Sequence, residues 1–170
     1  MRNCDQNFHL DIPYPRVQVD GPNQRYGMLL LQDYASATSE LTGVCQYSYQ
    51  SYYNQERNPD VAQLFLQIAQ DDMRHLHMLG EMIYLLGVSP RYRVIDLNCR
   101  EHYWRASYVD SSKTLKKQLM EDIAGKQTAI CNYQKRLQQI EDENIAAVLR
   151  RILLDEEHHM QLLQAAMEDL

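Results

Sequence analysis

Apolar residues recur every three or four positions along four long stretches of the chain, a spacing that predicts amphipathic α-helices. These stretches run from about 24 to 54, from 60 to 86, from 112 to 140, and from the acidic turn EDEN (141–144) to 167. No segment shows the strict alternation of apolar and polar residues that is typical of a half-buried strand. The pattern therefore predicts an all-α protein.

The lengths of the connections predict how the four helices are arranged. Short polar links join the first helix to the second and the third to the fourth, which favours two antiparallel hairpins. The second helix is predicted to start at an N-cap, Asp60, and to stop before Gly87 and Pro90. A connection from Gly87 to Ser111 then follows, long enough to cross the bundle, and Trp104 within it is expected to pack against the helices. The expected fold is a ferritin-like four-helix bundle with one crossover.

The first 22 residues contain three prolines, one glycine and no apolar period. We expect residues 1–22 to form an extended arm that lies over the bundle or over a neighbouring subunit. Residues 23–170 are expected to form a single domain, with Pro22 or Asn23 at the start of the first helix. Because the arm has no apolar pattern of its own, we also expect a homo-oligomer, a dimer or larger.

Charge and composition narrow the range of partners and compartments. A net charge of −6 argues against nucleic acid or an anionic membrane as the main partner. No apolar run approaches the roughly 18 residues of a membrane span, and no apolar block follows Arg2, so no secretory signal is expected. The four cysteines are far apart and form no CxxC motif, which favours reduced thiols and a cytoplasmic location.

Polar residues interrupt the apolar stripe near the middle of each predicted helix. They are Glu40 on the first helix, Asp72 and His75 on the second, Lys126 on the third, and Glu156 and His159 on the fourth. Leaving such groups buried without partners would cost several kcal/mol, so they must meet a metal ion, an opposite charge or a hydrogen-bond network. A carboxylate-x-x-His pair on two helices, with one residue from each of the others, is the pattern of a dimetal carboxylate site.

Lys126 occupies the position where that pattern expects a carboxylate. Three states therefore remain open: two metal ions with an unusual fourth residue, one ion with the ammonium in place of the other, and an ion-pair cluster without metal. The ligand set with Glu40 and His75 is complete, whereas the set with His159 lacks its terminal carboxylate, so we expect the first half-site to bind more tightly. Asp72 and Glu156 are the expected bridging ligands.

Several other polar residues are weaker candidates. His77 and His158 lie beside the stripe and are expected to be exposed or to hydrogen-bond to ligands. Asp71 and Glu157 could hydrogen-bond to ligands, but solvated charges are the ordinary expectation. Asp155 and His158 have the spacing of a ligand pair but point in a different direction. Tyr47 and Tyr133 are expected to face the core near the site, because helical spacing places them on the inner stripe.

The order and register of these motifs give the chain a resemblance to the ferritin-like superfamily, in its rubrerythrin and manganese catalase branch. YPRVQVDGPNQRYGMLLLQDYASATSELTG resembles the N-terminal region of manganese catalases and maps a ligand to Glu40. QDDMRHLHMLGEMI is similar to the second-helix motif and maps ligands to Asp72 and His75, while LLDEEHHMQLL carries Glu156 and His159. In EDIAGKQTAICNYQ the family's glutamate falls on Lys126.

The resemblance implies redox chemistry of peroxide or dioxygen at an iron or manganese centre, with one or two ions per chain. The alternative is a catalytically silent structural or assembly protein, with one ion or none, in which Lys126 replaces a ligand and its charge. Iron storage is a third hypothesis, although nothing in the sequence defines a shell-forming surface. Iron and manganese accept the same ligands, so the sequence leaves the choice of metal open.

Overall fold

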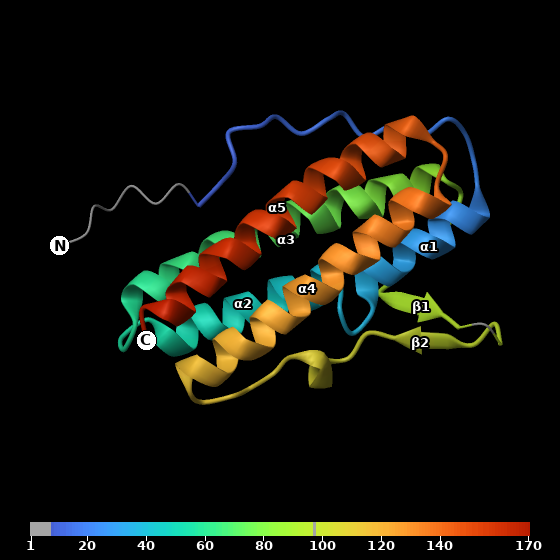
Figure 1. Ribbon diagram of the computed structural model, residues 1–170. Coiled ribbons are helices and arrows are strands. Elements are labelled where there is room, and N and C mark those ends of the chain that lie inside the picture. The colour runs from blue at the N-terminus through green and yellow to red at the C-terminus, as the bar shows by residue number, and fades with distance from the viewer. Residues whose placement is uncertain (1–7, 97) are drawn as a thin grey trace.

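The structure is a computed structural model that describes residues 8–96 and 98–170. Its elements are α1 (Gln24–Ala35), α2 (Glu40–Asn54), α3 (Pro59–Leu85), β1 (Arg93–Ile95), β2 (Glu101–Tyr103), the 3₁₀ turn η1 (Ala106–Tyr108), α4 (Leu115–Gln139) and α5 (Glu143–Glu168). Helices α1 and α2 together take one position of a four-helix bundle, and α3, α4 and α5 take the others (Figure 1). The predicted ferritin-like bundle is confirmed.

The first helix is interrupted, contrary to the prediction of one helix from 24 to 54. Helix α1 ends at Ala35 and α2 begins at Glu40, so the chain between them is not helical. Here the carbonyl oxygen of Ser36 accepts hydrogen bonds from the hydroxyl groups of Ser39 (2.8 Å) and Thr42 (2.9 Å). Hydroxyl side chains that bond to nearby backbone groups compete with the helical hydrogen bonds. Ser39 then caps α2 by accepting from the backbone N–H of Thr42.

The crossover between α3 and α4 contains a small β-ribbon, so the prediction of a chain without strands was wrong. Strands β1 and β2 pair in antiparallel fashion beneath α1 (Figure 1). Each strand has only three residues, too few for a period of two to be read from the sequence. Trp104 follows β2 and donates its indole N–H to Thr42 Oγ1 at 2.9 Å, which confirms that it holds the crossover against the bundle.

The predicted ends of the second helix were partly correct. The N-cap of α3 is Asn58, two residues before the predicted Asp60, so Pro59 lies in the first turn and Asp60 is inside the helix. Proline suits this position because its missing N–H would have no partner in the first turn. At the other end, Gly87 has a φ of 82°, the left-handed conformation that glycine adopts most easily after a helix.

The described part of the N-terminal arm, residues 8–22, runs along the outside of α3 and α5 (Figure 1). Arg151 of α5 donates its Nε–H to the carbonyl oxygen of Ile12 at 2.9 Å, and the backbone N–H of Asp20 donates to Asp142 at 2.7 Å. Asp142 is also the N-cap of α5. The arm therefore covers the groove between two helices of its own chain.

Two apolar clusters fill the interior, one toward each end of the bundle. One cluster contains Leu79 and Leu149, and the other contains Phe65 and Leu163. The polar residues predicted to interrupt the stripes lie between these clusters along α3 and α5, so the bundle holds a polar layer between two apolar ones.

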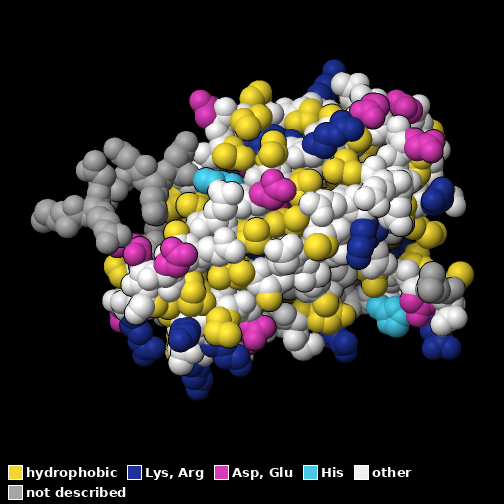
Figure 2. All heavy atoms as spheres, viewed as in Figure 1, with side chains coloured by type: hydrophobic (Ala, Val, Ile, Leu, Met, Phe, Trp, Pro, Cys, Tyr) yellow, Lys and Arg dark blue, Asp and Glu magenta, His cyan; other side chains and the backbone are white. Residues whose placement is uncertain are grey.

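The surface carries no single dominant charge on the face that Figure 2 shows. Acidic, basic and apolar side chains are interspersed over most of it. Within residues 8–96 and 98–170, no helix combines the length and the apolar composition that crossing a membrane requires. Over the same ranges Cys45, Cys99 and Cys131 form no disulfide, while Cys4 lies outside the described residues.

Candidate metal centre

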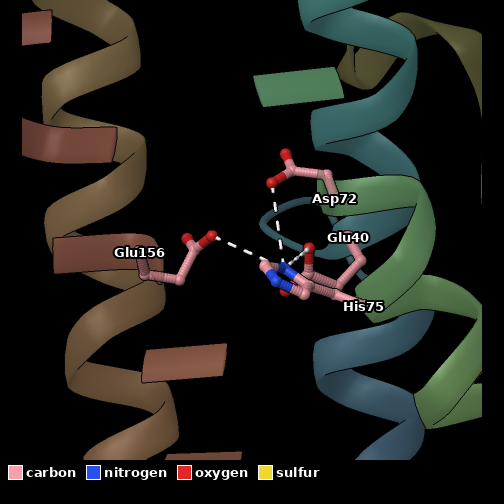
Figure 3. Close-up of side chains that lie close together, drawn as sticks. All are labelled: Glu40, Asp72, His75 and Glu156. Carbon is pink, nitrogen blue, oxygen red and sulfur yellow. Dashed lines mark ion pairs between the residues drawn. The ribbon is translucent and has the colours of Figure 1, made fainter. Parts of the chain in front are cut away.

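Four buried side chains from three helices meet in the polar layer. Glu40 comes from α2, Asp72 and His75 from α3, and Glu156 from α5, and one potential ligand atom of each lies within 4.8 Å of the others (Figure 3). His159 lies next to this group, with its Nδ1 atom 3.6 Å from Glu156 Oε1 and 3.8 Å from Asp72 Oδ1. The structure thus brings together all five side chains predicted as ligands.

A close approach of α2 and α3 brings Asp72 into the cluster. Gly43 lies three residues after Glu40 on α2, and a Cβ atom at this position would collide with Asp72 Oδ2. This role of Gly43 was not predicted from the sequence, although Gly43 is the last residue of the segment ELTG that begins at Glu40. The helix therefore needs a residue without a side chain at the point where the carboxylate of Asp72 passes.

Lys126 of α4 reaches the centre of the cluster and pairs with two of its carboxylates. Its ammonium group donates to Glu156 Oε1 at 2.8 Å and to the two oxygens of Asp72 at 3.0 and 3.3 Å. The face of the Tyr47 ring lies 5.1 Å from Nζ, within the range of a cation–π contact. Burial alone would lower the pKa of Lys126, but the charges of Asp72 and Glu156 hold this pKa well above its usual value.

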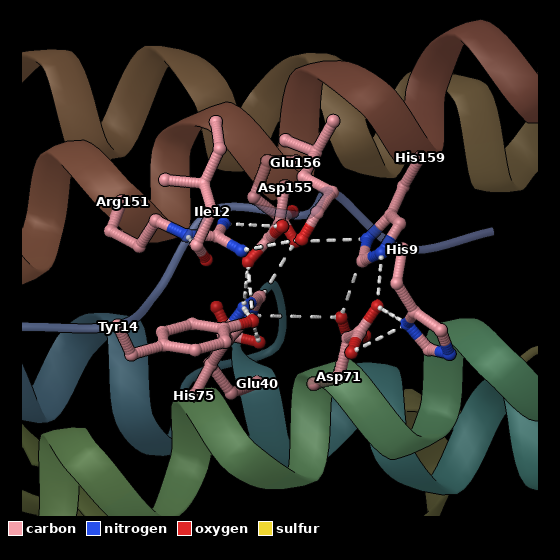
Figure 4. Close-up of polar contacts among 12 residues, drawn as sticks. His9, Ile12, Tyr14, Glu40, Asp71, His75, Arg151, Asp155, Glu156 and His159 are labelled. Atoms are coloured by element: carbon pink, nitrogen blue, oxygen red, sulfur yellow. Dashed lines mark hydrogen bonds and ion pairs between the residues drawn. The ribbon is translucent and has the colours of Figure 1, made fainter. Parts of the chain in front are cut away.

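The outer nitrogen of His75 is held by a polar network that includes the arm (Figure 4). Nε2 of His75 donates to Asp155 at 2.9 Å, and the Tyr14 hydroxyl donates to the same carboxylate oxygen at 2.5 Å. Arg151 pairs with the other oxygen of Asp155 at 2.5 Å and lies 4.1 Å from the centre of the Tyr14 ring. These contacts fix both the orientation of the imidazole and the position of its Nε2 proton.

His159 is held in a similar way by a second aspartate. Its Nε2 atom donates to Asp71 Oδ2 at 3.1 Å, and His9 of the arm donates to the same carboxylate oxygen at 2.9 Å. The side chain of His9 is 46% exposed, so this network reaches solvent, whereas Asp155 and Arg151 are buried. Figure 4 shows the two networks side by side, each running from the cluster to the arm.

The inner nitrogens of both histidines fit a metal ligand. Nδ1 of His75 and Nδ1 of His159 are buried and make no hydrogen bond with any described residue. An imidazole whose Nε2 is bonded to a carboxylate and whose Nδ1 faces a group of carboxylates has the arrangement usual for metal-bound histidine. The residues present fit one cation bound by Glu40, Asp72, His75 and Glu156. The Lys126 ammonium lies between Asp72 and Glu156.

Proton affinities in the cluster reflect burial and the close charges. Burial lowers the pKa of His75, but Glu40 and the hydrogen bond to Asp155 outweigh burial and raise the value to about 10. Burial raises the pKa of Glu156, but Lys126, His159 and His75 together outweigh burial and lower the value to about 2. Burial raises the pKa of Asp72 to about 7 against the opposing charge of Lys126. A cation that binds His75 therefore takes the place of a proton.

A cavity of about 360 Å³ connects the cluster to the surface between α2 and α4. Its lining includes Glu40, Asp72, Lys126 and Glu156 at the inner end, and the exposed Glu121 among the residues of α4. The cavity is large enough for water and other small molecules. The arm covers the opposite side of the cluster, so access to the carboxylates lies on the side of α4.

The remaining sequence predictions gave a mixed outcome. His77 is exposed and His158 is partly buried, as expected for residues beside the stripe. The ordinary expectation of a solvated charge was wrong for Asp71, and the hydrogen bond of Asp155 to His75 was not predicted. Tyr47 and Tyr133 face the core, and the Tyr133 hydroxyl donates a short hydrogen bond to Glu40.

Known proteins resemble this chain in sequence or in fold. A probable manganese catalase from Clostridium acetobutylicum is 27% identical over 169 residues, which cover 89% of this chain and 74% of that protein. The crystal structure of a manganese catalase from Anabaena superposes with a TM-score of 0.83 at 24% identity, over 95% of this chain and 79% of that one.

The bacterioferritin of Mycobacterium tuberculosis has the same fold, with a TM-score of 0.71 at 23% identity over 87% of each chain. The rubrerythrin family matches residues 34–167, a range that contains α2, α3, α4, all but the last residue of α5, and all the cluster residues. The chain is a ferritin-like protein with a buried carboxylate and histidine cluster, and it belongs to the rubrerythrin family.

Proposed function

We propose that the protein binds manganese or iron at the cluster and carries out redox chemistry on peroxide or dioxygen. The observation that carries this proposal is the pair of buried imidazoles, each with Nε2 bonded to an aspartate and Nδ1 facing carboxylates. The similarity to a probable manganese catalase supports manganese and peroxide, since its name contains both the metal and the activity.

In this proposal Glu40, Asp72, His75 and Glu156 hold the ion, and a bound manganese or iron would supply the change of oxidation state. Carboxylates offset the charge of the cation, and the imidazole gives it one directional ligand. The protein also excludes bulk water: the four ligands are each no more than 5% exposed, and the arm covers the histidine networks. Small oxidants reach the ion through the cavity between α2 and α4.

The alternative is a silent scaffold in which the ion pairs of Lys126 replace the metal. It is less well supported, because the ion pairs leave both Nδ1 atoms without a hydrogen bond among the described residues. A cation bound by Glu40 and His75 would give the Nδ1 atom of His75 a direct partner, which the ion pairs of Lys126 do not provide. Membership of the rubrerythrin family also favours metal binding over an ion-pair cluster without metal. So does the presence of Glu40 and His75 together with Asp72 and Glu156.

Metal binding and turnover test the proposal directly. The protein is purified without chelator, loaded separately with Mn(II) and Fe(II), and passed through a desalting column before its metal content is measured. Oxygen release from peroxide and peroxide-driven oxidation of a dye are then followed. We expect bound metal and turnover of peroxide in at least one form. If no metal is bound after loading at saturating Mn(II) or Fe(II), the proposal is wrong. If metal is bound but peroxide is not turned over, the protein binds metal without the proposed activity.

Three further expectations belong to this proposal. We propose that the chain assembles into a homo-oligomer, that it acts in the cytoplasm without a nucleic-acid or membrane partner, and that residues 23–170 act as one domain with 1–22 as an arm. Size-exclusion chromatography with light scattering measures the first of these, and limited proteolysis measures the last.

A further inference from the structure

Lys126 lies where a second cation of a dimetal site would have to bind. Its ammonium nitrogen is 2.8 Å from Glu156 Oε1 and 3.0 Å from Asp72 Oδ1, the two carboxylates expected to bridge a pair of ions. We propose that the Lys126 ammonium takes the place of one metal ion, so that the centre binds a single divalent cation through Glu40, Asp72, His75 and Glu156. This inference rests on the proposed function and specifies the number of ions.

The charges in the cluster balance with one divalent ion. Glu40, Asp72 and Glu156 carry three negative charges, and Lys126 carries one positive charge, which leaves two negative charges. Asp155 is paired with Arg151, so it adds no further uncompensated charge. A second divalent ion would leave an excess of two positive charges in a buried site, and uncompensated buried charge is strongly unfavourable.

The hydrogen bonds also leave ligand atoms available for one ion. Each carboxylate has two oxygens with about four acceptor positions in total, so Asp72 and Glu156 can accept from Lys126 and still bind a cation. Both carboxylates face His75 as well, because Asp72 Oδ1 and Glu156 Oε1 lie 4.0 and 3.9 Å from its Nδ1. They can therefore bridge the ammonium and one metal ion, in the way they would bridge two metal ions.

The surroundings of Lys126 keep the ammonium in this position. Its side chain is 5% exposed, and the face of the Tyr47 ring covers Nζ. Moving the ammonium out would leave two buried carboxylates without their cation, and breaking a buried ion pair in this way is strongly destabilising. Metal binding at the second position would have to overcome this cost, whereas binding beside Glu40 and His75 leaves the ion pairs intact.

The test is the number of manganese ions per chain in wild-type protein and in variants of Lys126. Each protein is stripped with a chelator, equilibrated with excess Mn(II), desalted and measured by inductively coupled plasma mass spectrometry. Electron paramagnetic resonance then distinguishes isolated Mn(II), which has a resolved hyperfine pattern, from a coupled pair. Lys135→Glu is the matched control, because Lys135 is exposed on the same helix and its substitution changes charge equally.

We expect one ion per chain with an isolated Mn(II) signal in wild type and in Lys135→Glu, and two coupled ions in Lys126→Glu. Two ions in wild type would overturn this inference but leave the proposed function intact, whereas no ion in any protein would overturn both. Folded Lys126→Glu that still binds one ion would also overturn the inference. If this variant does not fold, as judged by circular dichroism, the wild-type count decides.

Discussion

The two histidines of the cluster lie on equivalent faces of α3 and α5, but they have different neighbours. His75 has the carboxylate of Glu40 at 3.3 Å from its Nδ1 and a buried network of Asp155, Tyr14 and Arg151 behind it. His159 has the same type of aspartate behind it, but that network ends at the partly exposed His9. On the cluster side, α4 supplies Lys126, which bonds to Asp72, and Tyr133, which donates to Glu40.

This difference shows how two similarly arranged halves of a bundle become unequal when one helix contributes a lysine to the centre. In both halves the imidazole has a fixed orientation, and its buried Nδ1 atom faces carboxylates. The half that contains His75 also has the carboxylate of Glu40, whereas the half that contains His159 has no corresponding carboxylate from α4. The ammonium of Lys126 supplies the positive charge that a second ion would otherwise bring. We therefore expect changes to the His75 half to affect metal binding more strongly than matched changes to the His159 half.

Removing each imidazole should give the largest contrast. We expect His75→Ala to lower the affinity for Mn(II) by more than about 100-fold, beyond the range usual for loss of an outer partner, because it removes a direct ligand. His159→Ala should retain one ion with a much smaller loss. Isothermal titration calorimetry measures both affinities, with His77→Ala as the control, since His77 is exposed on the same helix as His75. Equal losses in the two variants would contradict the inequality of the halves.

Replacing the aspartate behind each histidine should give a smaller contrast. Asp155→Asn should reduce Mn(II) affinity by about 10–100-fold, because the orienting hydrogen bond of His75 weakens and Arg151 loses its ion pair. Asp71→Asn should reduce the Mn(II) affinity by less than about tenfold, below this range. Competition with a coloured chelator gives both values, and circular dichroism shows whether each variant is folded. A larger loss in Asp71→Asn would place the ion near His159 instead.

The contacts from the arm should give the smallest contrast. Tyr14→Phe removes one hydrogen bond to Asp155, worth about 0.5–1.5 kcal/mol, and should lower Mn(II) affinity by about two- to twelvefold. His9→Gln should change the affinity by less, since His9 is partly exposed and contacts His159 indirectly, through Asp71. The same chelator competition measures both variants. An unchanged affinity in Tyr14→Phe would mean that the arm does not influence the His75 half.

Much of this arrangement could be predicted from the period of the helices. Glu40, Asp72, Glu156 and both histidines stand in the apolar stripes, and a stripe position in a bundle faces the interior whatever residue it holds. The long connection after Gly87 likewise predicted the crossover. The break between α1 and α2 could not be found in this way, because it depends on hydroxyl groups bonding to the Ser36 carbonyl while the apolar spacing continues unchanged.

Asp155 and Asp71 show a different limit. Each lies one position before a stripe residue, where a four-helix bundle alone would expose it to solvent. The arm covers this face and buries both carboxylates, and the arm itself has no periodic pattern from which its path could be predicted. The residues behind the histidines therefore depend on a long-range contact between a segment without secondary structure and two helices.

The most direct test of the account is a crystal structure of the manganese-loaded protein with anomalous diffraction data collected at the manganese absorption edge. The account predicts one anomalous peak per chain, among Glu40, Asp72, His75 and Glu156, with the Lys126 ammonium still bonded to Asp72 and Glu156. Two peaks, the second beside His159 and Lys126 displaced from the carboxylates, would contradict it.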